Sequence, residues 1–433
     1  MKITGVSGRM ILDSRGVPTV EATVRTEKGT ASAGVPAGTS TGRHEAKELR
    51  DGDDRWNGQG VRQAVSHVNV EIAHALQGMD ATDQAAVDAK LTELDKSKKP
   101  GLGANALLAV SVATFLAAAR GKRKEPWQML GGGSPGGSQS GPKGIPVPML
   151  NLINGGAHAK NGLEIQEFMV VPLGFDTFSE ALRAATETYH ALGTILDERN
   201  LGTGVGLEGG FAPQVGNHHD ALDLLIQAIE RAKYRPGDQI GLALDVAATE
   251  LYKEGAYKLA GQTMQAEQLA IEYESLLRQY PIVSIEDPFA EDDWDGWAAA
   301  PERVKTGRIA DDLTVTDAKR IKRAAGSGAT GVIIKPNQQG TLTAAVAAVA
   351  AARAAGLTVI ASHRSGETTD HWIADLAVGW EAEYIKAGAP ARGERVAKYD
   401  RLLAIEQEFG SQAVYRGPGL AASKEAAPGG TDG

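Results

Sequence analysis

Six short apolar runs in the second half of the chain each end on a polar or charged side chain. The runs occupy 242–245, 282–286, 309–311, 332–335, 359–363 and 384–386. From the second run onward, successive end residues lie 23 to 28 residues apart, which is the length needed for a strand, a helix and short loops. Helical patterns at 317–325 and 342–355 fill two of these intervals. The spacing predicts βα units that end on Asp245, Glu286, Asp311, Lys335, His363 and Lys386.

Repeated βα units of this length indicate an α/β fold and favour a (β/α)8 barrel. In such a barrel the active site is built at the carboxyl ends of the strands, so the six side chains are expected on one rim. Charged residues also end strands simply because strands stop at the surface. That explanation suffices for one strand, but it is weak for six in succession that carry both signs of charge.

By composition, the 433 residues divide into four parts. The first begins with β-branched, strand-like runs and continues with apolar residues at helical spacing, which predicts a small α+β domain. The second is rich in Gly, Ser and Pro and is typical of a flexible linker. The predicted parts are an α+β domain over 1–130, a linker over 131–144, a barrel over 145–420 and a disordered tail over 421–433.

Three carboxylates among the strand ends predict a metal site. Asp245, Glu286 and Asp311 are hard oxygen ligands of the kind that Mg²⁺ prefers. The chain has no cysteine, which excludes a thiolate zinc site and a cysteine nucleophile. Lys335 and Lys386 end later runs on the same rim, where nearby positive charge favours the neutral amine and allows one lysine to act as a base. The alternative is that the lysines only pair with the acidic side chains.

Further candidate residues lie on Gly-rich loops. The segment 363–365 combines a planar cation with a hydroxyl, which suits phosphate. The loop 37–42, which contains Gly38 and Ser40, offers backbone amides and hydroxyls, although it lacks the Gly-Lys-Ser/Thr ending of a P-loop. For each acid–base candidate taken singly, a surface or capping role is the better explanation. These candidates are Glu167, Glu208 and His158.

Charge and hydropathy exclude several classes of partner. The formal net charge is −9, and an acidic chain repels nucleic acid and anionic membranes, so neither is an expected partner. The most apolar run, 107–119, is too short to cross a bilayer and is expected to form a buried helix. Residues 1–16 contain no apolar core of signal-peptide length, and the expected location is the cytoplasm.

Eight stretches, in order and spread over nearly the whole chain, resemble the enolase family. They read DSRG at 13–16, STG at 40–42, NGGAHA at 154–159, QEFM at 166–169, SIEDPF at 284–289, DDLTVT at 311–316, SHRSGET at 362–368 and KAGAPAR at 386–392. The resemblance implies an N-terminal α+β capping domain and a C-terminal enolase-type (β/α)8 barrel. It also implies that the first units of the barrel depart from simple βα order.

The resemblance further implies roles for the candidate residues. Two Mg²⁺ ions are implied per site, with Asp245, Glu286 and Asp311 on the first. Ser40 would help to bind the second together with the substrate phosphate. Lys335 would remove the proton from C2, and Lys386 would stabilise the resulting enolate. Glu208, with Glu167, would handle the departing C3 hydroxyl. The residues implied to hold substrate are Gly38, His158, His363, Arg364 and Ser365.

Several positions depart from the pattern that this family usually shows. They are Leu207 before the catalytic Glu (usually Asp), Ala37 and Thr39 in the covering loop (Ser and Ala), Gln339 after the basic Lys (Ile), and Ala404, where an Arg usually bridges subunits to the equivalent of Glu21. The expected reaction is the dehydration of 2-phosphoglycerate to phosphoenolpyruvate, in a homodimer. The alternative is a paralogue that dehydrates a phosphonate analogue, as the enolase-like carboxyphosphonoenolpyruvate synthases do. A non-catalytic binding protein is a weaker hypothesis, because the metal ligands and both lysines are present.

Overall fold

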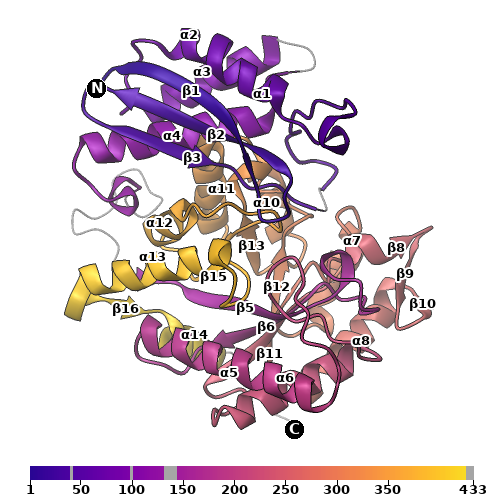
Figure 1. Cartoon of the computed structure of the whole chain (residues 1–433). Helices are drawn as coiled ribbons and strands as arrows, with labels where there is room; N and C mark the ends of the chain where they lie inside the picture. The colour runs from indigo at the N-terminus through magenta and orange to yellow at the C-terminus, as the bar shows by residue number, and fades with distance from the viewer. Residues whose placement is uncertain (40–41, 98–100, 131–143, 426–433) are drawn as a thin grey trace.

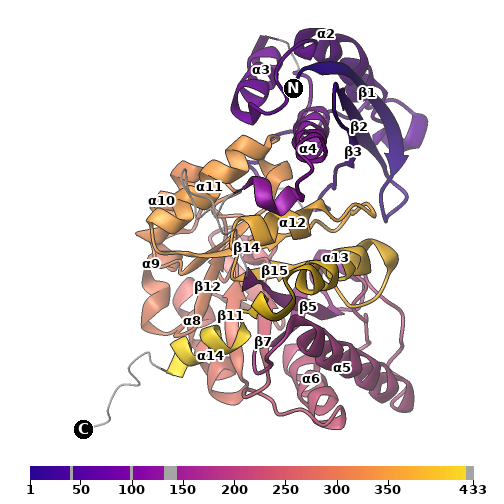
Figure 2. The ribbon, with the colours of Figure 1, turned by 90° about the vertical axis from the view of Figure 1, so that its left-hand side faces the viewer.

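The computed structural model describes residues 1–39, 42–97, 101–130 and 144–425. An N-terminal domain sits on one end of a larger C-terminal barrel domain (Figure 1), and the turned view in Figure 2 shows the same arrangement. The predicted linker, apart from Gly144, and the end of the predicted tail lie outside the described residues.

The N-terminal domain is a three-stranded antiparallel sheet, in the order β1-β2-β3, packed against helices. Burial alternates along β2, where Val20, Ala22 and Val24 are buried, as expected for a sheet with one face on a core. This is the predicted α+β domain. Its elements are β1 (Ile3–Leu12), β2 (Pro18–Thr26), β3 (Thr30–Gly34), η1 (Arg55–Gly58), α1 (Arg62–His67), η2 (Val68–Ile72), α2 (Ala73–Leu76), α3 (Gln84–Ser97), α4 (Ala104–Gly121) and η3 (Pro126–Met129).

Helix α4 is the central helix of this domain and contains the apolar run 107–119. It packs on β2 and β3, and it also contacts α11 of the barrel domain. Among the described helices it is the one that is long and apolar enough to cross a membrane, but 83% of it is buried inside the protein. The prediction of a buried core helix is therefore confirmed.

The barrel domain is built on a closed sheet of eight strands. The strand order around the barrel is β11-β12-β13-β14-β15-β5-β6-β7. Neighbours pair in parallel, except that β6 is antiparallel to both β5 and β7, so the first units do depart from simple βα order. The strands are β5 (Val147–Asn154), β6 (Glu167–Pro172), β7 (Ile240–Asp245), β11 (Ile282–Glu286), β12 (Gly307–Ala310), β13 (Gly331–Ile334), β14 (Thr358–Ser362) and β15 (Tyr384–Lys386).

Helices cover the outside of the barrel and bury nearly continuous apolar strands. The main helices are α5 (Phe178–Glu198), α6 (His218–Arg231), α8 (Ala266–Gln279), α9 (Trp294–Ala299), α10 (Ala318–Ala325), α11 (Leu342–Ala354), α12 (Trp372–Gly379), α13 (Gly393–Phe409) and α14 (Gly417–Glu425). The short elements are β4 (Gly144–Ile145), η5 (Gly156–His158), α7 (Ala248–Leu251), β8 (Tyr252–Lys253), β9 (Ala256–Leu259), β10 (Gln262–Met264), η6 (Ala300–Glu302), η7 (Pro336–Gln338), η8 (Gly410–Gln412) and β16 (Val414–Tyr415).

The start of the predicted tail differs from the prediction. Helix α14 continues to Glu425, so disorder from Ala421 onward is wrong for these first residues. Leu420 and Ala421 pack against the hydrophobic core, which holds this stretch in place although its composition is typical of a tail. Gly144, at the end of the predicted linker, is likewise ordered as the first residue of β4, which pairs with β16.

Polar contacts dock the N-terminal domain onto the barrel. The indole Nε1 of Trp372 donates to the carbonyl of Gly34 at 3.2 Å, and the backbones of Ala37 and Gly366 exchange two hydrogen bonds. Between α3 and α11, the Asp88 carboxylate accepts from the backbone N–H of Thr343 at 2.8 Å and from its hydroxyl at 2.6 Å. Thr343 lies in the first turn of α11, where a negative charge is favoured by the helix dipole.

We expect Asp88→Ala to destabilise the protein by about 1–3 kcal/mol, because it leaves the partly buried N–H and hydroxyl of Thr343 without their acceptor. Urea unfolding followed by tryptophan fluorescence measures this loss. Glu93→Ala is the control on the same helix, since Glu93 forms an exposed pair with Lys90 that is worth roughly 0.3–0.5 kcal/mol. Equal effects of the two substitutions would contradict a docking role for Asp88.

Candidate active site

The strand-end residues meet on one rim of the barrel, as the spacing predicted. Asp245 and Glu286 are the last residues of the neighbouring strands β7 and β11 and lie in register with each other. Glu167 is the first residue of the antiparallel strand β6, where it pairs with Asp245. Because β6 runs in the opposite direction, the beginning of this strand reaches the rim at which the other strands end.

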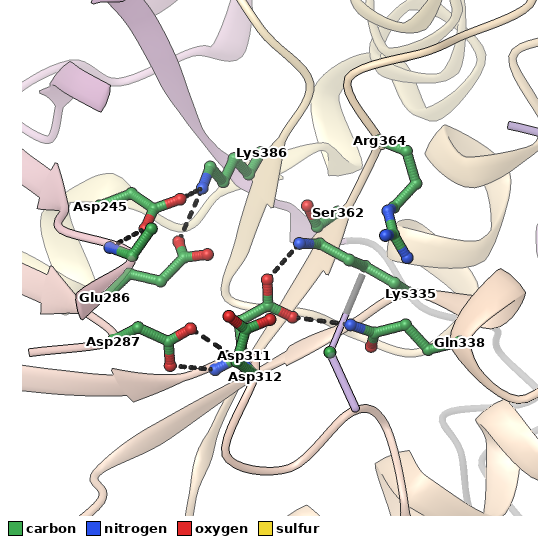
Figure 3. Close-up of polar contacts among 12 residues, drawn as sticks. Asp245, Glu286, Asp287, Asp311, Asp312, Lys335, Gln338, Ser362, Arg364 and Lys386 are labelled. Atoms are coloured by element: carbon green, nitrogen blue, oxygen red, sulfur yellow. Dashed lines mark hydrogen bonds and ion pairs between the residues drawn. The ribbon is translucent and has the colours of Figure 1, made fainter. Parts of the chain in front are cut away.

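Lys386 forms ion pairs with several carboxylates, and Figure 3 shows it beside Asp245 and Glu286. Its Nζ is 2.8 Å from Asp245 Oδ2, 2.8 Å from Glu286 Oε2 and 3.1 Å from Glu167 Oε1. Burial lowers the pKa of Lys386, but the surrounding carboxylates outweigh burial and hold it well above its usual value. Burial and the charge of Asp245 raise the pKa of Glu286 to about 8.

Lys335 forms a second ion pair on the same rim, with Asp311. Asp311 also accepts from Gln338 Nε2 at 3.0 Å. Burial raises the pKa of Asp311, but the positive charges of Lys335, Arg364 and Lys386 together bring it below the ordinary value. The carboxylate of Asp287 accepts the backbone N–H groups of Asp311 and Asp312, each at 2.9 Å. Asp311 is therefore held through both its backbone and its side chain (Figure 3).

Glu208 forms a third centre with two histidines. Its Oε2 accepts from Asn151 Nδ2 at 2.9 Å, and its Oε1 lies 3.6 Å from His158 Nδ1 and 3.5 Å from His363 Nε2. Burial would raise the pKa of Glu208, but the charges of His158, His363 and Arg395 bring it well below the ordinary value. Burial and the charge of Glu208 raise the pKa of Glu167 well above its ordinary value.

The predicted phosphate-binding residues lie on the loop after β14. Arg364 pairs with Glu45 at 2.9 Å, and the Ser365 hydroxyl accepts from the backbone N–H of Thr39 at 2.9 Å. Gly38, Thr39, Arg364 and Ser365 line one pocket together with Lys335, Lys386, Glu167, Glu208, His158 and His363. Ser40, the predicted ligand of a second metal ion, lies outside the described residues.

The carboxylates fit a divalent metal ion. Glu286 Oε1 and Glu167 Oε2 are buried and have no hydrogen-bond partner among the described residues, and a cation would satisfy such oxygens. One oxygen from each of Asp287, Asp311 and Asp312 lies within 4.8 Å of the others. Asp245, Glu286 and Asp311 surround the two lysines from neighbouring strands, and an all-oxygen set of this kind suits a hard cation.

Several residues that position this site were not predicted. Asn151 is a buried amide in the middle of the mostly apolar strand β5, which is a signal that the sequence does contain. Arg395 of α13 is fully buried and donates to His363 Nδ1 at 2.6 Å and to the carbonyls of Arg364, Ser365 and Leu207. Because Arg395 cannot accept a proton, His363 must carry its own on Nε2, which faces Glu208. No pattern in the sequence distinguishes Arg395 from the surface arginines of an amphipathic helix.

Thr316 is a further unpredicted residue, and it connects three parts of the rim. Its hydroxyl accepts from the backbone N–H of Lys335 at 2.9 Å and donates to Gln338 Oε1 at 2.6 Å. Val315 and Thr316 both have positive φ angles, 43° and 56°, which are strained for β-branched residues. Gln339 Nε2 donates to the carbonyl of Val315 at 2.7 Å and so helps to hold this turn.

The fold and the site together define a class of enzyme. This barrel places several carboxylates and the two lysines Lys335 and Lys386 around one pocket at the carboxyl ends of its strands, and such a set of groups is suited to the metal-assisted removal of a proton next to a carboxylate.

Comparisons with known proteins agree with this class. Residues 3–130 match the family model "Enolase, N-terminal domain", and residues 142–424 match "Enolase, C-terminal TIM barrel domain". A protein named "Enolase" from Acidothermus cellulolyticus (strain ATCC 43068 / DSM 8971 / 11B) is 50% identical over 422 residues, which cover 96% of each chain. The chain therefore belongs to the enolase family, and it is a hydro-lyase of the enolase type. Its acidic side chains could hold the divalent metal ion that membership of this family implies.

We expect Thr316→Val to lower kcat/KM roughly 10–100-fold, the usual effect of removing a partner that orients a metal ligand or a catalytic group. The substitution keeps the shape of the side chain but removes the acceptor for Lys335 and the donor to Gln338. Thr316→Ser keeps the hydroxyl and should stay close to wild type. Steady-state kinetics measure kcat/KM for both variants. An equal loss of kcat/KM in both would mean that the effect comes from packing rather than from the hydroxyl.

Proposed function

We propose that the chain catalyses the Mg²⁺-dependent dehydration of 2-phosphoglycerate to phosphoenolpyruvate. The observation that carries this proposal is one pocket lined by Lys335, Lys386, Glu167 and Glu208 beside the acidic rim. These are the groups that proton removal at one carbon and hydroxyl loss at the next require. The 50% identity to a protein named "Enolase" supports the same reaction.

The difficult step is the removal of a proton next to a carboxylate, because it places two negative charges on one group. Lys386, held as an ammonium by Asp245 and Glu286, offers a fixed positive charge for that group. Asp245, Glu286 and Asp311 would hold Mg²⁺. When bound, Mg²⁺ neutralises the developing charge and offsets the carboxylates around both lysines.

Lys335 is the proposed base. Burial lowers the pKa of the Lys335 ammonium, and Arg364 and Lys386 lower it further, but the carboxylates, Asp311 first and Glu286 next, bring it above its ordinary value. The carboxylate of Asp311 is therefore the main reason that Lys335 stays protonated. If a bound Mg²⁺ offsets the charge of Asp311, burial and the positive neighbours of Lys335 favour its neutral amine, which is the form that a base requires.

Glu208 and Glu167 are the proposed groups at the departing C3 hydroxyl. One oxygen from each lies within 4.8 Å of the other and of a nitrogen of His158. Their pKa values are shifted in opposite directions, with Glu167 raised and Glu208 lowered. Glu167 therefore holds the proton that the pair can deliver to the hydroxyl, while Asn151 keeps Glu208 aimed into the pocket.

The remaining predicted residues would hold the substrate. Arg364 and Ser365 suit phosphate oxygens, and the Gly38–Thr39 backbone approaches them from the N-terminal domain. Ser40 stays a prediction as a ligand of a second Mg²⁺. The homodimer and the cytoplasmic location also stay proposals.

No specific observation favours the phosphonate analogue. Among the described residues that line the pocket, neither Ala37 nor Leu207 is present. The backbone carbonyl of Leu207 accepts from Arg395 Nη2 at 3.1 Å, a contact that does not depend on the side chain. Ala37 joins Gly366 through its backbone. The side chains of these two positions, Ala37 and Leu207, therefore do not line the pocket that holds the reacting groups.

We expect the purified protein to convert 2-phosphoglycerate with a kcat in the usual enzyme range of roughly 1–10³ s⁻¹. Ultraviolet absorbance of the enol product measures the rate. Excess chelator should abolish the activity and Mg²⁺ should restore it, because the carboxylate set has to be neutralised. The same assay with the phosphonate analogue is the comparison. A higher kcat/KM for that analogue would overturn the proposed substrate, and full activity in chelator would overturn the metal requirement.

We expect Lys335→Ala to slow exchange of the C2 proton with deuterated solvent by roughly 10²–10⁴-fold, the usual contribution of a general base. Proton NMR of 2-phosphoglycerate measures the exchange. Glu208→Gln is the matched variant, because it should block product formation and leave C2 exchange intact. If the lysine variant exchanges at the wild-type rate, Lys335 is not the base.

A further inference from the structure

A second group of metal-ligating side chains lies on the flank of the barrel, apart from the active-site pocket. His218 and His219 are the first two residues of α6, and Glu272 lies on α8. The Oε1 atom of Glu272 is 3.0 Å from His218 Nε2 and 3.5 Å from His219 Nε2. One ligand atom from each of the three residues lies within 4.8 Å of the others.

These distances match the spacing of ligands around a tetrahedral ion. Zinc binds nitrogen at 2.0–2.1 Å and carboxylate oxygen at 2.0–2.2 Å, which places neighbouring ligand atoms about 3.4 Å apart. The two measured N–O distances, 3.0 and 3.5 Å, lie on either side of that value. The side chains therefore need only small shifts to close around an ion.

The outer contacts of His219 leave Nε2 available as a ligand. Its Nδ1 lies 3.4 Å from the hydroxyl of Tyr280, and that hydroxyl donates to Asp223 Oδ1 at 2.8 Å. Since the tyrosine proton is directed to Asp223, the ring N–H of His219 sits on Nδ1 and Nε2 keeps its lone pair. Histidines that bind metals usually donate their other ring N–H to such a partner.

His218 also favours the neutral form that metals require. Burial lowers the pKa of the imidazole, although Glu272 opposes this effect. His218 follows the N-cap residue Asn217 directly, and a positive charge is disfavoured at the beginning of a helix. A protonated pair with Glu272 is the competing explanation of the contact, and both of these features oppose it.

The surroundings leave room for a further ligand. The three residues line a hollow together with Glu164, Asn217, Gln262 and Met264. His219 and Glu272 are partly exposed, with 36% and 28% of their side chains accessible. Two imidazoles and one carboxylate with an open position suit zinc or a similar transition metal, whereas Mg²⁺ prefers oxygen ligands.

We propose that His218, His219 and Glu272 form a binding site for a zinc-type transition metal ion, separate from the active site, that ties the beginning of α6 to α8. This site does not depend on the proposed reaction. An ion bound there joins two outer helices, α6, which precedes β7 in the chain, and α8, which precedes β11.

The test is a calorimetric titration of the full chain with Zn²⁺, after chelator treatment and in excess Mg²⁺ so that the active-site carboxylates are occupied. The variants are wild type, the double variant His218→Ala with His219→Ala, and Glu272→Gln. His74→Ala is the control, because His74 is an exposed helical histidine in the N-terminal domain. We expect wild type and the control to bind one more zinc ion than the double variant. Glu272→Gln should bind that ion more than tenfold more weakly.

Loading with Co²⁺ supplies a spectroscopic readout of the same site. Wild type should show the visible absorption of four-coordinate Co²⁺, and the double variant should lack that contribution. Circular dichroism and turnover with Mg²⁺ establish that each variant is folded. If the double variant fails to fold, the zinc affinity of the nearly isosteric Glu272→Gln variant provides the test instead. Equal zinc stoichiometry and affinity in wild type and the folded variants would overturn the proposal.

Discussion

The buried ammonium group of Lys386 is the interaction on which the rest of the site depends. It lies within 3.1 Å of carboxylates from three strands, Glu167, Asp245 and Glu286. Carboxylates placed so close together in a buried site repel one another, and one cation does not balance them. Burial, together with this repulsion from neighbouring carboxylates, raises the pKa values of Glu286 and Asp312 to about 8. The same excess of buried negative charge favours the binding of a divalent cation at this rim.

A second layer of side chains determines where these charges lie. Asp287 holds the backbone of Asp311 and Asp312, and Thr316 holds the backbone of Lys335. Arg395 holds the carbonyls of the loop after β14 and orients His363. These contacts are mostly to backbone atoms, so they constrain whole loops rather than single side chains. The contact of Arg395 with Leu207, for example, is to the backbone carbonyl and does not depend on the side chain at that position.

The sequence predicted the parts of this architecture that follow from periodicity. Parallel strands present their ends on one edge, so the spacing of the apolar runs was enough to place the strand ends from Asp245 to Lys386 on a common rim. The position of Glu167 could not be obtained this way, because β6 is antiparallel and its rim residue comes first in the strand. The turn at Val315 and Thr316 could not be predicted from the sequence, because β-branched residues seldom adopt the positive φ angles that it requires. Helix α14 was missed because its composition is typical of a tail and its order comes from packing.

The closure of the barrel between β15 and β5 also has a kinetic consequence. These two strands come from opposite ends of the barrel sequence and pair Lys386 with Met149. Lys386 is thus brought to Glu167 and Asp245 only after nearly the whole domain has been synthesised and the last strand has docked. Pairings of such high sequence separation form late and slowly. A nascent or truncated chain would carry the carboxylates without the cation that holds them together, so the order of synthesis itself keeps the site from assembling before the fold is complete.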